Sequence, residues 1–187
     1  MKNIILFASG SGTNVENICR YFQHHPTIKV AALCCNNPGA GVLERVKPFH
    51  IPVHLFNRNE FKDEQFFLPL LNQYQPDLLV LAGFLWLIPE YLVKQYPNKI
   101  INIHPALLPK FGGKGMYGHH VHEAVLAQKE KEHGITIHFV NEKYDDGTPI
   151  FQAKFNVKPH FTLADIQKNI AALEMAYFPE AIKRVLN

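Results

Sequence analysis

The chain alternates short apolar runs of strand length with segments whose apolar residues recur every three or four positions. The first run is Ile4–Ala8, and after a glycine-containing loop Val15, Ile18 and Phe22 fall on one face of a helix. Further strand-like runs cover 29–35, 53–56, 77–82 and 99–103, and helical patterns cover 43–47, 61–74 and 89–95. This order predicts an α/β fold, in which a mostly parallel, twisted sheet has helices on both faces.

The last third of the chain follows a different pattern. Residues 134–140 alternate in character, and residues 149–157 can pair with them through a turn, which predicts antiparallel strands at the C-terminal side of the sheet. Residues 123–132 are predicted to be helical, and Thr162 is predicted to cap a long final helix. Since the 187 residues contain no linker or repeat, we expect one domain, residues 1–187.

Composition excludes several classes of protein. With 47% apolar and 19% charged residues, the chain is expected to be globular and not disordered. The net charge of +3 is mild and the lysines are scattered, so we expect no nucleic-acid partner. No apolar run approaches the roughly eighteen residues of a membrane span, so no membrane partner is expected. Cys34 and Cys35 lie together in an apolar run, which predicts reduced, buried thiols in a cytoplasmic protein.

One strand-like run ends in two polar side chains. If the backbone stays extended through His104, Asn102 and His104 point to the same face. An amide and an imidazole suit the stabilisation of a developing oxyanion and the movement of a proton. Open α/β sheets also place their sites at strand ends. The alternatives are a partly buried structural histidine and an asparagine that merely flanks a turn.

The loop at 9–14 resembles a nucleotide-binding turn only in part. Gly10, Ser11 and Gly12 match the start of a dinucleotide fingerprint, but Val15 stands where that fingerprint has its third glycine. The second strand also ends in asparagines and not in an acidic residue. There is no Gly-Lys-Ser/Thr sequence either. Free backbone amides at a helix start suit a single phosphate on a small substrate. The alternative is an ordinary turn capped by Ser11 or Thr13.

Three other residues have two interpretations each. Asp145 lies in an Asp-Asp-Gly turn, and such residues are common in turns for conformational reasons alone. The other interpretation is that its carboxylate faces His104 and favours the imidazolium. Trp86, just past a strand end, is a core residue or the wall of a pocket for a flat ring. Glu174 on the last helix is solvated, or accepts a hydrogen bond from a sugar hydroxyl.

A cluster at His119, His120, His122 and Glu123 raises the question of a metal ion. It lacks the His-Glu-x-x-His spacing, and no cysteine pair lies nearby. We therefore expect a solvent-facing helix start and no metal site.

Several segments together resemble one family, the phosphoribosylglycinamide formyltransferases. The resemblance covers nearly the whole chain. The asparagine–histidine–proline motif is shared with other folate-dependent formyltransferases, whereas the first loop is more specific to the glycinamide enzymes. The matching segments are Ser9–Asn14, Leu81–Phe84, Asn102–Lys110, His138–Val140 and Asp145–Gly147.

The resemblance implies a Rossmann-like formyltransferase fold and an activity. The formyl group of 10-formyltetrahydrofolate would pass to the amine of 5-phosphoribosylglycinamide, a step of de novo purine (IMP) biosynthesis. The amine would attack directly, with His104 as general acid and Asp145 raising the pKa of His104. The implied catalytic residues are Asn102, His104 and Asp145; the implied substrate residues are Gly12, Thr13 and Asn14 for the phosphate and Glu174 for the ribose; the implied folate residues are Leu85, Trp86, Leu87, Ile88 and Asn102.

The chain departs from the family pattern at the folate side. Many members have an arginine where this chain has Trp86, and another where it has Glu64. Those arginines assist folate binding, the second by meeting the carboxylate tail, and Lys62 is nearby but not aligned with it. The segment Gly112–His120 is also longer than in many relatives, so we expect a different lid over the substrate.

Other activities on the same fold remain as alternatives. Enzymes that formylate methionyl-tRNA carry a further C-terminal domain and an arginine pattern after the Leu-Leu-Pro motif that Lys110–Gly113 lacks, and formyltetrahydrofolate hydrolases carry an added N-terminal domain. Transfer to a nucleotide sugar is another alternative. A non-catalytic nucleotide-binding module would not need Asn102, His104 and Asp145 to converge. We expect small-molecule substrates and a monomer or homodimer.

Overall fold

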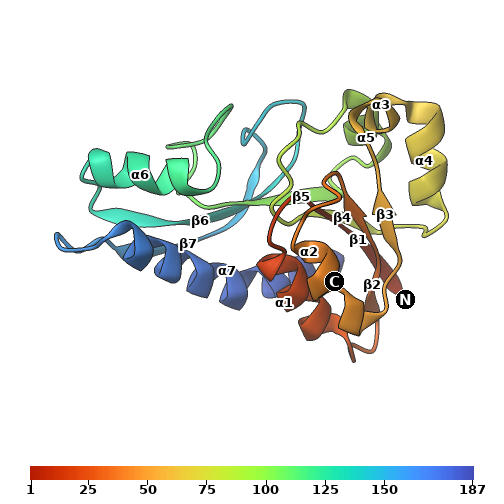
Figure 1. Cartoon of the computed structure of the whole chain (residues 1–187), viewed down its shortest axis with the longest axis horizontal. Helices are drawn as coiled ribbons and strands as arrows, with labels where there is room; N and C mark the ends of the chain where they lie inside the picture. The colour runs from red at the N-terminus through yellow and green to blue at the C-terminus, as the bar shows by residue number, and fades with distance from the viewer.

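A computed structural model describes residues 1–187, which form one seven-stranded sheet with helices on both faces (Figure 1). The strands are β1 (Lys2–Ala8), β2 (Ile28–Cys35), β3 (Val53–Leu55), β4 (Leu78–Leu81), β5 (Ile100–His104), β6 (Glu132–Phe139) and β7 (Pro149–Asn156). The helices are α1 (Thr13–Phe22), α2 (Val42–Arg45), α3 (Arg58–Lys62), α4 (Glu64–Asn72), α5 (Glu90–Gln95), α6 (His119–Ala127) and α7 (Leu163–Leu186), with a 3₁₀ turn at Lys47–Phe49.

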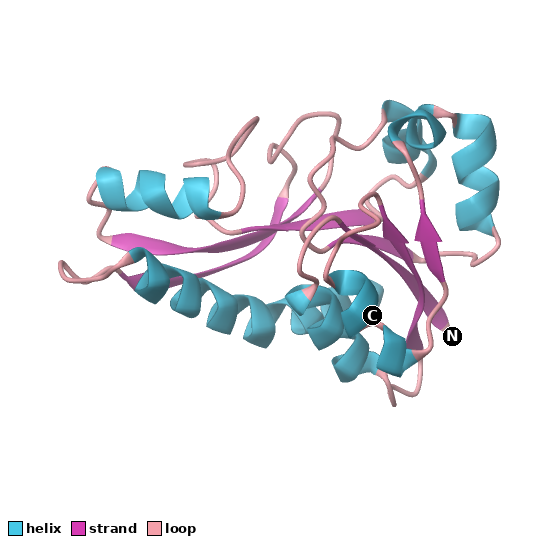
Figure 2. Ribbon diagram, in the orientation of Figure 1, coloured by secondary structure: helices cyan, strands magenta, loops and turns pink.

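The sheet has the order β3-β2-β1-β4-β5-β6-β7. The first five strands of this order are parallel, and β6 runs antiparallel to both β5 and β7. In Figure 2 the helices lie on either side of the magenta strands. One face is covered by α1, α2 and α7, with α6 packed against α7, and the other face is covered by α3, α4 and α5. The predicted fold class is therefore confirmed, including the antiparallel strands at the C-terminal side.

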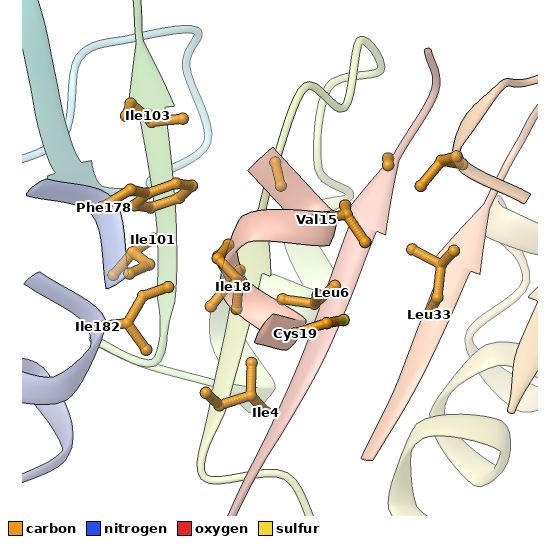
Figure 3. Packing of buried hydrophobic residues seen from close by; sticks show 14 of the residues in the cluster. Ile4, Leu6, Val15, Ile18, Cys19, Leu33, Ile101, Ile103, Phe178 and Ile182 are labelled. Carbon is orange, nitrogen blue, oxygen red and sulfur yellow. The ribbon is translucent and has the colours of Figure 1, made fainter. Parts of the chain in front are cut away.

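The alternation of side chains along β1 divides the core into two clusters. Ile4 and Leu6 face α1 and α7, whereas Ile5 and Phe7 face the opposite side, as the period of two in a strand requires. Figure 3 shows the first cluster, where Phe178 and side chains of α1 cover the sheet. The second cluster is rich in aromatic rings: Phe7, Phe56, Phe61, Phe67 and Phe84.

The predictions about the cysteines and about the start of the last helix are confirmed. Cys34 and Cys35 are buried free thiols on β2, as predicted. Thr162 caps α7 in a capping box with Asp165, and the helix runs on to Leu186. No helix combines the length and the apolarity needed to cross a bilayer.

The segment predicted as one helix at 61–74 is largely helical, but it is divided between two helices, α3 and α4. α3 starts earlier, where Asn57 forms a capping box with Glu60. Asp63 then takes an extended conformation (φ −87°, ψ 103°) and its carboxylate caps α4 by accepting from the Gln65 amide. Two capping residues six positions apart interrupt a single apolar pattern.

The helix predicted at 123–132 is also misplaced. α6 begins at His119, directly after Gly118, whose φ of 56° and ψ of −133° suit only glycine. The helix ends at Ala127, and Glu132 already belongs to β6, where it pairs with Asn156. Pairing between β6 and β7 thus sets where β6 begins, which the local sequence pattern did not indicate.

Replacing Phe178 should test how strongly α7 is anchored. Phe178 is fully buried between α7 and the sheet, so Phe178→Ala should lower the free energy of unfolding by about 3–5 kcal/mol. Met175 on the same helix is 49% exposed, and Met175→Ala should change stability by no more than about 0.5 kcal/mol. Urea unfolding followed by circular dichroism measures both; equal losses would contradict this packing.

Candidate active site

The strand order reverses between β1 and β4, and a cavity of about 1030 Å³ lies at that place. The chain passes from β1 to β2 and β3 on one side, then returns to β4 and β5 on the other. Loops that leave the carboxyl ends of such strands diverge and leave a crevice. The cavity is lined by the loops after β1, β4 and β5, by one side of α7, and by the segments around 113–118 and 138–145.

The loop after β1 presents backbone amides to this cavity. Gly12 is the N-cap of α1 with φ 81°, and a Cβ at this position would overlap Val42 of α2, so glycine is required. The predicted cap by Ser11 or Thr13 is wrong, because no side chain caps α1. The amides of the first turn therefore lack a side-chain partner, and the helix dipole favours an anion there.

Glu174 of α7 faces the same loop. Its carboxylate accepts a hydrogen bond from the Asn14 side-chain amide at 2.9 Å, and both residues line the cavity. Burial raises the pKa of Glu174, while the Asn14 hydrogen bond opposes that rise. Glu174 is therefore half-buried at the wall of the cavity and is not a fully solvated residue of the helix.

Asn102 and His104 lie at the end of β5, which stays extended through His104 as expected. Both line the cavity, and His104 is only 4% exposed. The segment that follows is tied to β6, because Thr136 Oγ1 donates to the carbonyl of Ala106 at 2.7 Å and accepts from the Leu108 amide at 3.0 Å. The strand end is therefore held rigidly where the two side chains emerge.

Asp145, not Asp146, faces His104. Its Oδ2 lies 3.4 Å from His104 Nδ1 and accepts from the Gly113 amide at 3.0 Å. Its Oδ1 accepts from the Asn102 amide at 3.4 Å. Asp146 is exposed and instead accepts from the Asn141 side chain at 3.1 Å. The carboxylate of Asp145 thus joins β5, the β6–β7 loop and the glycine-rich segment that starts at Gly112.

The backbone around Asp145 is unusual. Asp145 has φ 52°, a left-handed conformation uncommon for residues with a side chain. Gly147 lies so close to the carbonyl of Phe139 that any Cβ would overlap it. The turn residues therefore do more than reverse the chain, because their conformation sets where the carboxylate points.

Burial and partners act in opposite directions on the pKa of His104. Burial lowers this pKa and dominates, so its pKa lies below the usual range; the Asp145 carboxylate and the Phe111 carbonyl act to raise it. Asp145 therefore acts to raise the pKa of His104, as expected, but burial outweighs this effect. Burial also raises the pKa of Asp145, yet contacts with His138, His104 and the Gly113 amide outweigh it and leave that pKa lowered.

The imidazole of His104 has an acceptor at each nitrogen. Nε2 lies 2.7 Å from the carbonyl oxygen of Phe111, which can only accept, so Nε2 donates. Nδ1 faces Asp145. A neutral imidazole can donate from one nitrogen only, whereas the imidazolium satisfies both acceptors. The two acceptors therefore stabilise the imidazolium form of His104, although burial disfavours that form.

The apolar wall of the cavity is the segment after β4. Leu85, Trp86, Leu87 and Ile88 all line it, and Leu85 and Leu87 are more than 40% exposed. The Leu85 amide donates to Ser9 Oγ at 3.1 Å, which joins this wall to the loop after β1. Exposed leucines beside a half-buried tryptophan offer a surface for a flat ring.

The histidine-rich start of α6 divides into two groups. His119, His120 and Glu123 are exposed and bring three possible ligand atoms within 4.8 Å of one another, but none of them lines the cavity. His122 turns inward, and its Nδ1 lies 3.1 Å from His133 Nε2. The exposed trio is the one group whose ligand atoms are spaced closely enough to hold a metal ion, and it lies outside the site.

Sequence patterns did not point to two of the contacts. His138 lies opposite Asn102 in the antiparallel β5–β6 pairing, and the Asn102 amide lies 3.2 Å from His138 Nε2. The carbonyl of Phe111 is the other, since main-chain atoms carry no sequence signal. The alternation of β6 could have placed His138 on the cavity face, but only the strand register pairs it with Asn102.

Comparison with known proteins agrees with this geometry. The family model described as Formyl transferase matches residues 2–182. The phosphoribosylglycinamide formyltransferase of Bacillus subtilis is 37% identical, with 100% of this chain and 95% of the relative covered. A solved glycinamide ribonucleotide transformylase 1 from Geobacillus kaustophilus has a TM-score of 0.90 and 32% identity, with 100% of both chains covered. The chain belongs to the phosphoribosylglycinamide formyltransferase family.

Other relatives of this formyltransferase are similar along most of their length. The Escherichia coli phosphoribosylglycinamide formyltransferase is 32% identical, with 96% of this chain and 85% of the relative covered. Family membership supports formyl transfer in purine biosynthesis and implies a folate-type co-substrate for the formyltransferase.

The buried His122–His133 pair should make the stability of the formyltransferase depend on pH. Burial lowers the pKa of His133 to about 4, against about 6.5 in an unfolded chain. The unfolded state therefore binds more protons between these values, and stability falls as the pH drops from about 6.5 to 4, by on the order of 3 kcal/mol from this group. In urea unfolding at several pH values, His133→Gln should flatten this slope, and the exposed-site control His24→Gln should retain it. An unchanged slope in His133→Gln would contradict the assignment.

Proposed function

We propose that this enzyme transfers the formyl group of 10-formyltetrahydrofolate to the amine of 5-phosphoribosylglycinamide, by direct attack of the amine. The observation that carries the proposal is the order of groups within one cavity. Free amides and a carboxylate line one part of the cavity, an apolar wall lines another, and Asn102, His104 and Asp145 lie together where β5 ends. We further propose that residues 1–187 act as one domain.

The end of the cavity near α1 suits the phosphoribosyl part of the substrate. Backbone amides of Gly12, Thr13 and Asn14 would hold the phosphate, helped by the dipole of α1. Glu174 would accept hydrogen bonds from the ribose hydroxyls. Its hydrogen bond with Asn14 supports this, because it fixes the carboxylate beside the phosphate loop.

The opposite end suits the folate. Leu85, Trp86, Leu87 and Ile88 would contact its ring system, and Asn102 would contact the formyl group between the two ligands. This arrangement would set the amine of one substrate against the formyl carbon of the other. Positioning of this kind removes much of the entropic barrier of a reaction between two molecules.

The chemistry then needs stabilisation of charge and transfer of protons. As the amine attacks, a new C–N bond forms and the formyl oxygen becomes negative. The Asn102 amide and protonated His104 would donate to that oxygen, and such donors contribute about 2.7–4 kcal/mol each. Breaking the bond from the formyl carbon to the folate nitrogen completes the transfer. The proton lost by the amine would pass through water at Asp145 and reach the leaving nitrogen.

The Phe111 carbonyl gives this mechanism a structural requirement. Its oxygen holds the Nε2–H of His104 that the formyl oxygen would need. We infer that the substrate oxygen replaces it, and that the developing negative charge then favours the imidazolium that burial alone disfavours. No nucleophilic side chain or metal ion takes part in the proposed route.

Replacement of the two central residues tests the proposal. His104→Ala and Asp145→Asn should each lower the turnover of phosphoribosylglycinamide by at least about 10²–10³-fold. His104→Ala removes the donor to the formyl oxygen, and Asp145→Asn removes the negative charge beside His104. Asp146→Asn is the matched control and should keep turnover near the wild type, since Asp146 is exposed and bonds only to Asn141. The measurement is the initial rate of 10-formyltetrahydrofolate consumption, with circular dichroism as the test of folding. Wild-type rates in folded His104→Ala or Asp145→Asn would refute the mechanism.

A further inference from the structure

The loop after β1 is in contact with the short helix α2 on the side away from the cavity. Gly10, Ser11 and Gly12 all line the cavity, whereas no residue of α2 does. The contact is close, because a Cβ added to Gly12 would lie 2.5 Å from the Cβ of Val42. The loop therefore separates α2 from the space where a ligand would bind.

Two donors of α2 hold two consecutive carbonyl groups of this loop. Val42 is the first residue of α2, where an amide has no acceptor within the helix, and its amide donates to the Gly10 carbonyl at 3.1 Å. Arg45 is the last residue of α2, and its Nε donates to the Ser11 carbonyl at 2.9 Å. Both carbonyls thus point towards α2.

The direction of these carbonyls sets the direction of the amides that follow them. A peptide group is planar and trans, so its C=O and the next N–H point in opposite directions. The amides of Ser11 and Gly12 therefore point away from α2, and neither has an acceptor within the chain. Glycine at position 12 leaves the Ser11–Gly12 peptide free to rotate, so the contact with Arg45 is what holds its direction.

Arg45 is held in place at a second point. Its Nη1 donates to Glu16 Oε2 at 2.6 Å, and Glu16 lies in the first turn of α1. The Glu16 amide in turn donates to the Gly12 carbonyl at 2.9 Å. Arg20 occupies the other oxygen of the Glu16 carboxylate at 2.9 Å but makes no contact with the loop. Arg45 thus joins the loop to the helix that the loop begins.

We propose that Arg45 is a positioning residue for phosphate recognition: by holding the Ser11 carbonyl, it directs the Gly12 amide at the phosphate of the substrate. This inference rests on the proposed function, in which this loop binds that phosphate. Arg45 does not line the cavity, so it acts through the backbone and touches no ligand. By the same geometry, the contact of Val42 with Gly10 adds the Ser11 amide to the groups that face the phosphate.

The preference of the protein for a phosphorylated ligand measures this role. Isothermal titration calorimetry compares phosphoribosylglycinamide with ribosylglycinamide, which lacks the phosphate. Arg45→Ala should raise the Kd for the phosphorylated ligand about tenfold and leave the other Kd within about twofold, because only the phosphate uses the amides. An equal loss of affinity for both ligands would mean general damage to the site, and no loss would mean no role. Either result overturns the inference.

Two further variants separate the hydrogen bond from the charge. The amide nitrogen of glutamine stands at the same place along the side chain as arginine Nε, so Arg45→Gln keeps a donor for the Ser11 carbonyl and loses the charge. It should keep the Kd for phosphoribosylglycinamide within about threefold of the wild type. Arg20→Ala removes a charge from the same carboxylate and should leave that Kd unchanged. Affinity in Arg45→Gln as low as in Arg45→Ala, or an equal loss in Arg20→Ala, would show that charge is responsible and would overturn the inference.

The same proteins separate this inference from the proposed function. If the wild type prefers the phosphorylated ligand in a manner that depends on Arg45 but transfers no formyl group to it, the positioning role stands and the proposed function fails. If the wild type formylates phosphoribosylglycinamide and Arg45→Ala binds it with unchanged affinity, the proposed function stands and the positioning role is refuted.

Discussion

The site depends on the contacts that the carboxylate of Asp145 makes with three other residues. One oxygen meets His104 Nδ1 and the Gly113 amide, and the other meets the Asn102 side chain. His104 and Asn102 come from the parallel strand β5, and Gly113 comes from a glycine-rich segment. Asp145 itself lies in the loop between β6 and β7, so these residues meet only because the antiparallel hairpin packs beside β5. The left-handed backbone of Asp145 and the obligatory glycine at 147 are the conformational cost of that arrangement.

The topology of the sheet explains why two dissimilar ligand surfaces meet there. Reversal of strand order between β1 and β4 separates the amide-bearing loop from the apolar segment 85–88 across one crevice. The hydrogen bond from the Leu85 amide to Ser9 Oγ ties these two walls together. An anionic substrate and a flat, largely apolar one can therefore be bound at opposite ends, with β5 delivering Asn102 and His104 between them.

The strands and loops could be predicted from the local sequence, because the strands are short, apolar and separated by glycine or proline. Prediction failed where capping or pairing overrode periodicity. Asp63 divides an apolar helical pattern into α3 and α4, and pairing of Glu132 with Asn156 ends the region assigned to α6. The alternation in β5 placed Asn102 and His104 on one face, but it could not reveal the Phe111 carbonyl. Nor could it show that burial outweighs Asp145 in setting the pKa of His104.

Following the formyl group itself tests the central claim most directly. Wild-type protein is incubated with 10-formyltetrahydrofolate carrying an isotopic label in the formyl group, together with equal concentrations of phosphoribosylglycinamide and of glycinamide without the ribosyl phosphate. The account predicts that the label appears in the phosphorylated amine, in stoichiometric amounts with the tetrahydrofolate formed. Label released as formate, or no preference between the two amines, would contradict a formyltransferase whose first loop binds the phosphate of its substrate.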